Sequence, residues 1–181
     1  MDLLDYMDAK KLLDKYGIKS IESAYVSSGK EAASFAAGRP IVLKVISNKA
    51  LHKSKAGLVK LNLSNEKEIA AAFELLERKA RQLRPHKMIA QKMAPGGVEV
   101  IIGGRTDPQF GHFVLIGLGG IYVEAFKDFA LRLCPITEYD ANEMIDQLRS
   151  KNVITYNGKA TAIMVLFLPP PAPAFAFCTI S

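Results

Sequence analysis

Hydrophobic residues recur every three or four positions in four stretches of this chain, a spacing that places them on one side of a helix. The predicted helices cover residues 8–16, residues 28–38, a long stretch from residue 65 and a last one from residue 137. Ser28, Asn65 and Thr137 begin three of them, and all three side chains commonly cap helix N-termini. Gly17 follows the first helix and Gly38 ends the second, and glycine commonly stands at the end of a helix.

Between the helices, short apolar runs predict strands. These runs cover residues 40–45, 58–63, 88–93, 98–102, 113–116 and 122–124. The tight sequence Pro95-Gly96-Gly97 predicts that the strands over 88–93 and 98–102 form a hairpin. Helices that alternate with strands and hairpins indicate an α/β protein whose sheets are not wholly parallel.

The composition changes abruptly at about Lys151. From there on the only charged residues are Lys151 and Lys159, and an apolar run over 160–168 leads into a cluster of prolines. The run is too short to span a bilayer, and the prolines would break a helix that tried. We therefore treat residues 151–181 as a separate tail. An artificial extension or a shifted reading frame explains it better than a poorly packed native tail.

The chain has 181 residues, of which 49% are hydrophobic and 23% charged, so one domain with a substantial core is expected. Its net charge of +6 favours anionic partners such as nucleotides or coenzyme A. Nucleic acid is not expected, because the sequence lacks an arginine-rich run and interleaved basic and aromatic residues. Two distant cysteines, Cys134 and Cys178, and an N-terminus unlike a signal peptide predict a cytoplasmic protein without a membrane anchor.

Three features carry candidate chemistry. Lys44 interrupts an apolar strand, where a charge is costly to bury without a partner, and phosphate is a natural partner for lysine. His52 follows in a loop that ends at Gly57, and the turn Gly117-Leu118-Gly119-Gly120 lets backbone approach a ligand closely. Together they indicate a protein that handles nucleotide and phosphate. Each also has a structural interpretation: a lysine reaching solvent from a strand end, an exposed loop histidine and a plain hairpin turn.

Seven short segments occur in one order along the chain: Tyr16-Gly17-Ile18, Val42-Leu43-Lys44, His52-Lys53-Ser54, Gly57-Leu58-Val59-Lys60-Leu61-Asn62-Leu63, Met93-Ala94-Pro95-Gly96-Gly97-Val98-Glu99-Val100, Asp107-Pro108-Gln109-Phe110-Gly111 and Gly117-Leu118-Gly119-Gly120-Ile121-Tyr122-Val123-Glu124. This series resembles the ATP-grasp domain of the ADP-forming acetyl-CoA (acyl-CoA) synthetases, in particular their separate beta subunit. The resemblance covers about residues 9–148. It implies an ATP-grasp fold over residues 1–150, incomplete at its C-terminal end, with α+β subdomains at about 20–93 and 94–150 that hold a nucleotide between them.

The resemblance implies the reversible reaction in which acyl-CoA, ADP and phosphate give free acid, CoA and ATP. In this family a CoA-binding alpha subunit forms acyl phosphate and takes the phosphoryl group onto its own histidine. The beta subunit then passes the group to ADP, and His52 would be its phosphoryl carrier. ATP or ADP and Mg²⁺ are therefore the implied cofactors, and a hetero-oligomer with the alpha subunit is the implied assembly.

The resemblance also implies roles for residues of the first subdomain. Lys44 would contact the nucleotide phosphates, because its flexible stem and compact charge suit a shifting anionic group. Gln91, Lys92 and Met93 would read the edge of the adenine base, mainly through backbone groups.

In the second subdomain, Glu99 would lie near the ribose or the phosphates. Gly119 and Gly120 would bring backbone amides to an oxyanion, and Glu124 would face the site of phosphoryl transfer. The metal ligands are unknown. The family binds Mg²⁺ through an Asp-Ile-Asn-Pro segment and a later aspartate, and neither motif occurs in this sequence.

Other positions also depart from the family pattern. Lys55 stands where an acid is usual, Gly57-Leu58 replaces two glycines, Lys92 replaces a frequent acid and His112 replaces a proline. Two alternatives to an enzyme subunit follow. One is a non-catalytic, truncated remnant with weak or no nucleotide binding, and the other is a basic module that binds anions of any kind.

Overall fold

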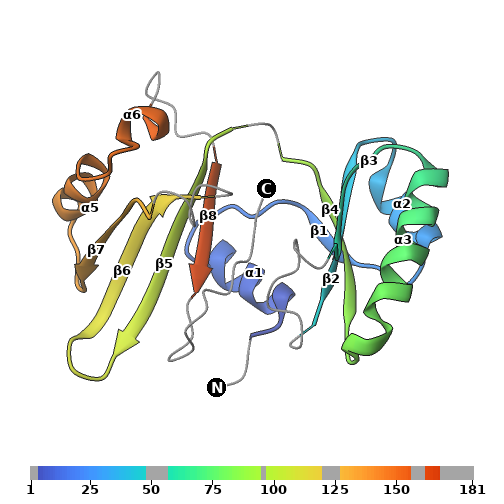
Figure 1. The fold of residues 1–181 in the computed structure, drawn as a ribbon, viewed down its shortest axis with the longest axis horizontal. Coiled ribbons are helices and arrows are strands. Elements are labelled where there is room, and N and C mark those ends of the chain that lie inside the picture. Colours follow the sequence, from blue (N-terminus) through green and yellow to red (C-terminus); the bar gives the residue numbers. More distant parts are fainter. Residues whose placement is uncertain (1–3, 48–56, 95–96, 120–126, 156–161, 168–181) are drawn as a thin grey trace. The chain divides into compact units, whose positions relative to one another are not determined.

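The computed structural model describes residues 4–47, 57–94, 97–119 and 127–155, and the backbone of 162–167. The chain forms two units, Met1–Ala94 and Pro95–Ser181, and each contains a four-stranded sheet (Figure 1). The predicted α/β fold class is confirmed. Within the described residues, no helix is long and apolar enough to cross a membrane.

The first unit contains an antiparallel sheet with the strand order β1-β4-β2-β3. Its strands are β1 (Ser23–Tyr25), β2 (Ile41–Ile46), β3 (Val59–Leu63) and β4 (Lys87–Lys92). Its helices are α1 (Tyr6–Lys15), α2 (Gly29–Ala36), α3 (Glu66–Ala80) and the 3-10 helix η1 (Arg81–Leu83). Every helix and strand predicted here is present with small shifts in its bounds, and β1 is additional.

Side chains cap α2 and α3 at their N-termini. The Asn65 side chain accepts a hydrogen bond of 2.9 Å from the backbone N–H of Glu68, and the Ser28 hydroxyl accepts one of 3.1 Å from that of Glu31. In return, the Glu31 carboxylate accepts a bond of 2.7 Å from the backbone N–H of Ser27. These bonds satisfy N–H groups that a helix leaves without intrahelical partners, so the starts of both helices could be read from local sequence.

Helices α2 and α3 pack against each other and against one face of the first sheet (Figure 1). Leu43 of β2 and Leu76 of α3 are fully buried in the core between these layers. Successive side chains of a strand point to opposite faces, so Lys44 lies on the other face of the sheet. We call the helix-covered side the α2–α3 face and the opposite side, where α1 makes its contacts, the α1 face.

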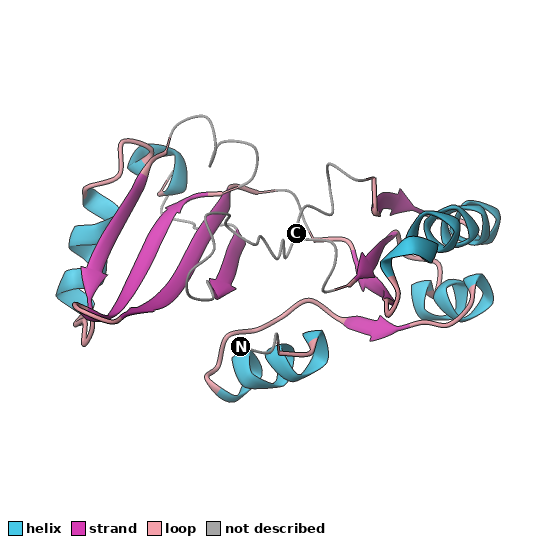
Figure 2. Ribbon diagram, turned by 60° about the horizontal axis from the view of Figure 1, so that its bottom comes forward, coloured by secondary structure: helices cyan, strands magenta, loops and turns pink. Residues whose placement is uncertain are grey.

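The second unit contains a mixed sheet with the strand order β7-β6-β5-β8. Its strands are β5 (Glu99–Asp107), β6 (Gly111–Leu118), β7 (Phe129–Leu133) and β8 (Ala162–Phe167). Strand β8 pairs with β5 in parallel, and the other pairs are antiparallel. Helices α5 (Glu138–Asp146) and α6 (Lys151–Ile154) complete the unit, and Figure 2 shows both helices on the same side of this sheet.

Thr137 begins α5 as predicted, with a complete capping box. Its hydroxyl accepts a 3.2 Å bond from the backbone N–H of Asp140, while the Asp140 carboxylate accepts a 2.8 Å bond from the backbone N–H of Thr137. Met144 of α5, Leu148 beyond its end and Ile154 of α6 are buried in the core of this unit.

One predicted pairing is wrong. The strands over 88–93 and 98–102 do not form a hairpin, because β4 belongs to the first sheet and β5 to the second. Strand β7 was not predicted, and β8 lies within the stretch interpreted as a tail. The strand predicted over 122–124 falls outside the described residues. The domain and subdomain boundaries stay predictions.

Candidate functional site

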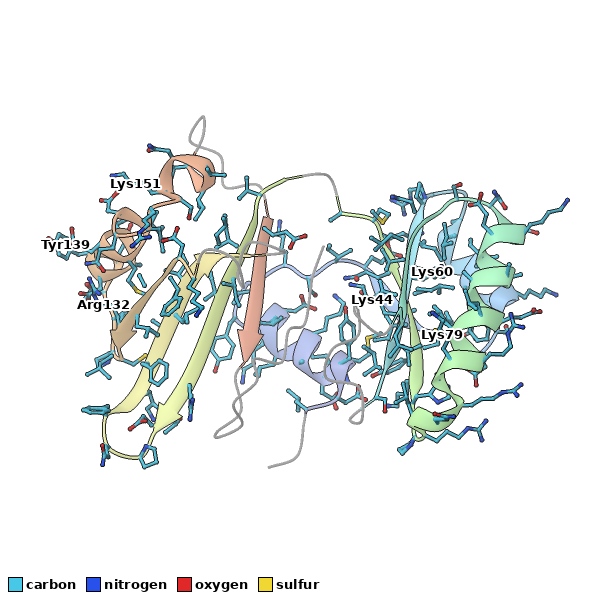
Figure 3. The ribbon with its side chains drawn as sticks, in the orientation of Figure 1. Lys44, Lys60, Lys79, Arg132, Tyr139 and Lys151 are labelled. Carbon is cyan, nitrogen blue, oxygen red and sulfur yellow. The ribbon has the colours of Figure 1, made fainter. Side chains whose placement is uncertain are left out.

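The α1 face of the first sheet carries two of the predicted nucleotide-binding side chains. Directly opposed residues of antiparallel strands share a face, and Gln91 of β4 stands opposite Val42 of β2 and Ser23 of β1. Lys44 lies two residues beyond Val42 and is therefore on this face as well. In Figure 3, Lys44 points to the side of the sheet away from α2 and α3. The structure thus brings Lys44 and Gln91 together on one surface.

Gln91 is fully buried, and only one end of its amide is satisfied. Its Nε2 donates a hydrogen bond of 3.4 Å to the Tyr6 hydroxyl of α1. Its Oε1 has no hydrogen-bond partner among the described residues. A buried carbonyl oxygen without a donor costs about 1–3 kcal/mol of stability.

Helix α1 is held on this face by bonds at its first residues. The Asp5 carboxylate caps the helix, accepting a 3.0 Å bond from the backbone N–H of Met7. It also accepts bonds of 2.7 Å from both the Tyr25 hydroxyl and the Lys87 ammonium group. The hydrogen bond from Lys87, followed by that from Tyr25, lowers the pKa of Asp5 to about 2. Burial, together with the bond to Asp5, raises the pKa of Tyr25.

The side chain of Lys92 lies on the opposite, α2–α3 face. Its ammonium group donates hydrogen bonds of 2.5 Å to the backbone carbonyl of Phe35 and 2.8 Å to that of Ala36, at the C-terminus of α2. It also stands 4.7 Å from the centroid of the Phe35 ring. Carbonyls in the last turn of a helix lack intrahelical partners, so Lys92 serves as a C-terminal cap. Its predicted contact with adenine would have to use its backbone, and this stays a prediction.

Met93 follows β4 and its backbone is partly engaged. Its N–H donates a 3.2 Å bond to the carbonyl of Pro40, as the N–H of Lys92 donates a 3.0 Å bond to that of Glu22. Two backbone donors of the predicted adenine-reading segment are therefore satisfied within the protein. Any contact of these two residues with a base through their backbone would fall to their carbonyl groups.

In the second unit, Glu99 and Gly119 are in direct contact. The N–H of Gly119 donates a 2.6 Å bond to the carbonyl of Glu99. A Cβ atom on Gly119 would lie 2.9 Å from the carbonyl carbon of Glu99, a distance that real Cβ atoms do not tolerate. Close packing accounts for this glycine, and its N–H already has an acceptor. The predicted role of Gly119 in contacting an oxyanion stays a prediction.

Three predicted residues, His52, Gly120 and Glu124, lie outside the described residues. Gly57, which follows the segment with His52, has a φ of +63°, a left-handed conformation that favours glycine. The ammonium group of Lys79 on α3 donates a 3.4 Å bond to the Gly57 carbonyl.

Sequence reasoning missed the contribution of α1 to this site. The side chains of Asp5 and Tyr6 contact residues of the α1 face that lie more than fifteen positions away in the sequence. Asp5 is a recognisable N-cap residue, so the start of the helix could have been found. Its partners Tyr25 and Lys87 belong to strands β1 and β4. No local sequence pattern reveals that the sheet brings them to Asp5.

No group of three or more His, Cys, Asp or Glu side chains within the described ranges could hold a metal ion. The described residues alone therefore do not fit the Mg²⁺ that the resemblance implied.

Fold and site together define a two-unit α/β protein in which a buried lysine and an unsatisfied amide share one sheet face. The chain belongs to the ATP-grasp domain family, whose model matches residues 1–165, and the predicted ATP-grasp fold is thereby confirmed.

Similar proteins place it more closely within that family. It is 40% identical over 153 residues to the beta subunit of acetate–CoA ligase (ADP-forming) I of Pyrococcus furiosus, covering 81% of this chain and 66% of that protein. The predicted homology to the beta subunits of ADP-forming acetyl-CoA synthetases is therefore confirmed. The chain spans just under two thirds of the length of that relative.

Two solved structures of acetyl-coenzyme A synthetase 1 from Ca. Korarchaeum cryptofilum are similar in fold. One, with coenzyme A, Ca-AMPCP and HgCl+, matches with a TM-score of 0.75 and 37% identity over 82% of this chain and 68% of that chain. The other, with coenzyme A and Mg-AMPPCP, has its phosphohistidine segment pointing towards the nucleotide-binding site. It matches with a TM-score of 0.68 and 37% identity over 84% of this chain and 67% of that chain.

Proposed function

We propose that this chain is the nucleotide-binding beta subunit of an ADP-forming acyl-CoA synthetase. In this reaction acyl-CoA, ADP and phosphate give free acid, CoA and ATP, and the beta subunit passes a phosphoryl group from a phosphohistidine to ADP. The observation that carries the proposal is the presence of Lys44 and Gln91 on one sheet face in a chain of this family. The relative from Pyrococcus furiosus is named a beta subunit, which supports a partner alpha subunit in a hetero-oligomer. The family resemblance implies that this partner binds CoA.

Each residue has a distinct part in this proposal. The Lys44 ammonium group neutralises nucleotide phosphate, and the segment Gln91–Met93 reads the edge of the adenine base, mainly through backbone groups. His52 carries the phosphoryl group: its neutral ring nitrogen attacks phosphorus, the donor's bond to phosphorus breaks, and ADP later takes the group from the ring. Glu99, Gly120 and Glu124 are assigned to the nucleotide and transfer sites by family resemblance alone.

Support for the histidine role comes from the Korarchaeum relative, in which a phosphohistidine segment points towards the nucleotide site beside Mg-AMPPCP. Mg²⁺ neutralises phosphate oxygens in phosphoryl transfer generally. Its ligands in this chain would have to include groups other than the described acidic and histidine side chains, which form no cluster.

The direct test is calorimetric titration of the purified chain with ADP, with and without Mg²⁺. Micromolar binding that Mg²⁺ strengthens would support the proposal and show that the chain supplies a metal site. Weak binding that ignores Mg²⁺ would indicate an incomplete site. Absence of binding would favour the alternative of a non-catalytic remnant, and equal binding of any polyanion would favour a general anion-binding module.

The histidine is tested separately, in a complex reconstituted with an alpha subunit. We expect His52→Asn to abolish ATP formation while ADP affinity stays nearly unchanged, because the carrier nitrogen is lost and the pocket is not. His112→Asn is the matched control, because it makes the same change at an exposed histidine of β6. ATP formation by the His52 variant at the rate of the control would remove His52 from the mechanism.

A further inference from the structure

Strand β7 is one edge of the second sheet, and its outer side carries backbone groups that the sheet does not use. In an antiparallel pair, successive residues direct their N–H and C=O groups to opposite sides of the strand. The Asp128 carbonyl, directly before β7, accepts a 3.2 Å bond from the N–H of Leu118 of β6. Every second residue from Asp128 onwards therefore bonds to β6, and Phe129, Leu131 and Leu133 direct their N–H and C=O groups away from the sheet.

The same three residues carry exposed apolar side chains. Ala130 is buried in the core to which Met144 of α5 belongs, so its neighbours in the strand point to the opposite face. Figure 2 shows both helices of this unit on one side of the sheet, which leaves the other side without a helix in the described part of the unit. Phe129, Leu131 and Leu133 are accordingly between 44% and 56% exposed. Free backbone groups and apolar side chains thus lie along one edge.

Both edges of the first sheet are built differently. Strand β1 has three residues, and β3 is irregular, because Asn62 has a φ of +56° and the pairing with β2 shifts in register. Short or irregular edge strands are usual means of preventing another chain from pairing. Strand β7 has five residues in unbroken register with β6. It is therefore the more suitable template for an added strand.

The sequence of β7 is complementary to itself. When two copies lie antiparallel and centred on Leu131, that residue stands opposite its own copy, Phe129 stands opposite Leu133, and Ala130 stands opposite Arg132. All three outward-directed residues then exchange backbone hydrogen bonds with the second strand. Their side chains meet on one face as apolar cross-strand pairs, and no like charges are opposed.

The neighbouring registers are less favourable. A pairing centred on Arg132 sets two guanidinium groups opposite each other and puts Pro135, which has no N–H, opposite Phe129. A pairing centred on Ala130 puts Leu133 opposite Lys127, whose φ of +47° interrupts the extended strand. The pairing centred on Leu131 therefore makes the most backbone bonds.

A hollow lies beside the end of β7 that the second copy's aromatic ring would meet. Its volume is about 300 Å³, and it is lined by Asp107, Phe110, Phe113, Leu131, Arg132 and Leu133. In the pairing centred on Leu131, Phe129 of the second copy stands opposite Leu133 and can enter this hollow.

We propose that β7 is a dimerisation surface, at which a second copy of this chain adds its own β7 antiparallel and joins the two sheets across a two-fold axis. Arg132 does not block the contact, although it donates a 3.0 Å bond to the Leu131 carbonyl, because a carbonyl oxygen accepts two hydrogen bonds. A five-residue strand buries little area, which places the contact among weak, reversible interfaces. The inference is independent of the proposed nucleotide site.

The test is sedimentation equilibrium of the purified chain from micromolar to millimolar concentration. We expect a monomer–dimer equilibrium, and we expect Leu131→Lys to raise its dissociation constant at least about tenfold, because two lysines would meet at the two-fold axis. Leu61→Lys is the matched control, since it makes the same change at an exposed leucine of β3, an edge strand of the other sheet. The control should dimerise as the wild type does.

A charge-pair rescue tests the register. Phe129→Glu combined with Leu133→Lys puts opposite charges face to face at both ends of the proposed pairing, so the double variant should dimerise more tightly than either single variant. Within one copy the two positions are four residues apart on an extended strand and do not meet.

Each remaining outcome overturns the proposal. These outcomes are a wild type that stays monomeric at every concentration, a dimer that Leu131→Lys leaves intact, association that continues beyond a dimer, and a double variant that dimerises no better than the single ones. If Leu131→Lys does not fold, as judged by circular dichroism, the comparison of the double variant with its single variants decides.

Discussion

The two faces of the first sheet each carry a buried lysine, and the two lysines have different surroundings. Lys44 on the α1 face is 7% exposed, and Lys92 on the α2–α3 face is 8% exposed. The ammonium group of Lys92 is bound to the last carbonyls of α2 and completes a helix end. Lys44 shares its face with Gln91, whose amide oxygen lacks a donor among the described residues. Burial and residue type are therefore the same for the lysine that caps a helix and for the lysine that we propose binds nucleotide phosphate.

Neighbouring residues show the same contrast at closer range. Gln91 and Lys92 are consecutive in β4, and the alternation of side chains along a strand sends them to opposite faces. One side chain is left with an unsatisfied oxygen, and the other joins sheet to helix. A stretch that resembles a nucleotide-binding segment can therefore contain a side chain that caps a helix.

The largest expected effect comes from the structural lysine. Lys92→Ala leaves the carbonyls of Phe35 and Ala36 without this donor, and we expect a loss of about 3 kcal/mol in the free energy of unfolding, measured with urea. Lys92→Met, which keeps most of the apolar stem, separates packing from hydrogen bonding. Unchanged stability with a loss of ADP affinity would reverse the assignment and place this side chain in the binding site.

Next in size is the effect of Lys44, the lysine that we propose binds nucleotide phosphate. Lys44→Ala should weaken ADP binding by about 1–3 kcal/mol, the loss of a charged hydrogen-bond donor, as measured by calorimetry. Lys60→Ala is the control. Lys60 of β3 stands opposite Leu43 of β2, which lies on the α2–α3 face, so this variant removes the same charge from the other face of the sheet. Figure 3 shows Lys44 and Lys60 on the same sheet. Equal ADP affinity in wild type and Lys44→Ala would remove Lys44 from the site.

A smaller effect is expected in the second unit, where close packing accounts for a glycine. Gly119→Ala brings a methyl group against the backbone of Glu99 and should reduce stability by about 1–2 kcal/mol. Gly104→Ala is the control, because the nearest atom to its Cβ would be the Phe113 carbonyl oxygen at 3.7 Å, an ordinary contact. Thermal unfolding of both variants measures the difference. Equal melting temperatures would show that the backbone around Gly119 yields easily.

The smallest effect concerns pH and the attachment of α1. The pKa of Asp5 is about 2 in the folded chain, below its ordinary value of 3.8, so the carboxylate stabilises the fold above pH 3.8. This contribution, about 1 kcal/mol or less because both partners are partly exposed, disappears as the pH falls from 3.8 towards 2. Urea unfolding of wild type and Asp5→Asn at pH 7 and pH 2.5 measures it. The difference in the free energy of unfolding between the two proteins should shrink at the lower pH. A difference that stays constant would contradict the stabilising role of the Asp5 carboxylate.

Local sequence predicted the helices because their signals are local. Asn65, Ser28 and Thr137 each cap a helix through a backbone group three residues ahead. Strand pairing was less predictable: the Pro95-Gly96-Gly97 sequence indicated a hairpin, yet the flanking strands enter different sheets. Strand β7 was not predicted. Its residues Phe129, Leu131 and Leu133 are exposed, so it lacks the buried apolar face that is typical of a strand.

The amino-acid sequence by itself determined the family, the α/β class and the identity of Lys44 and Gln91 as candidate binding residues, because these depend on residue types in a fixed order. Only the tertiary structure decided which side chain of β4 lies on which face, that Lys92 caps α2, and that Tyr6 of α1 meets Gln91. Those contacts join residues 56 and 85 positions apart. They depend on how helices and strands are assembled in three dimensions, and a one-dimensional pattern of residue types does not contain that arrangement.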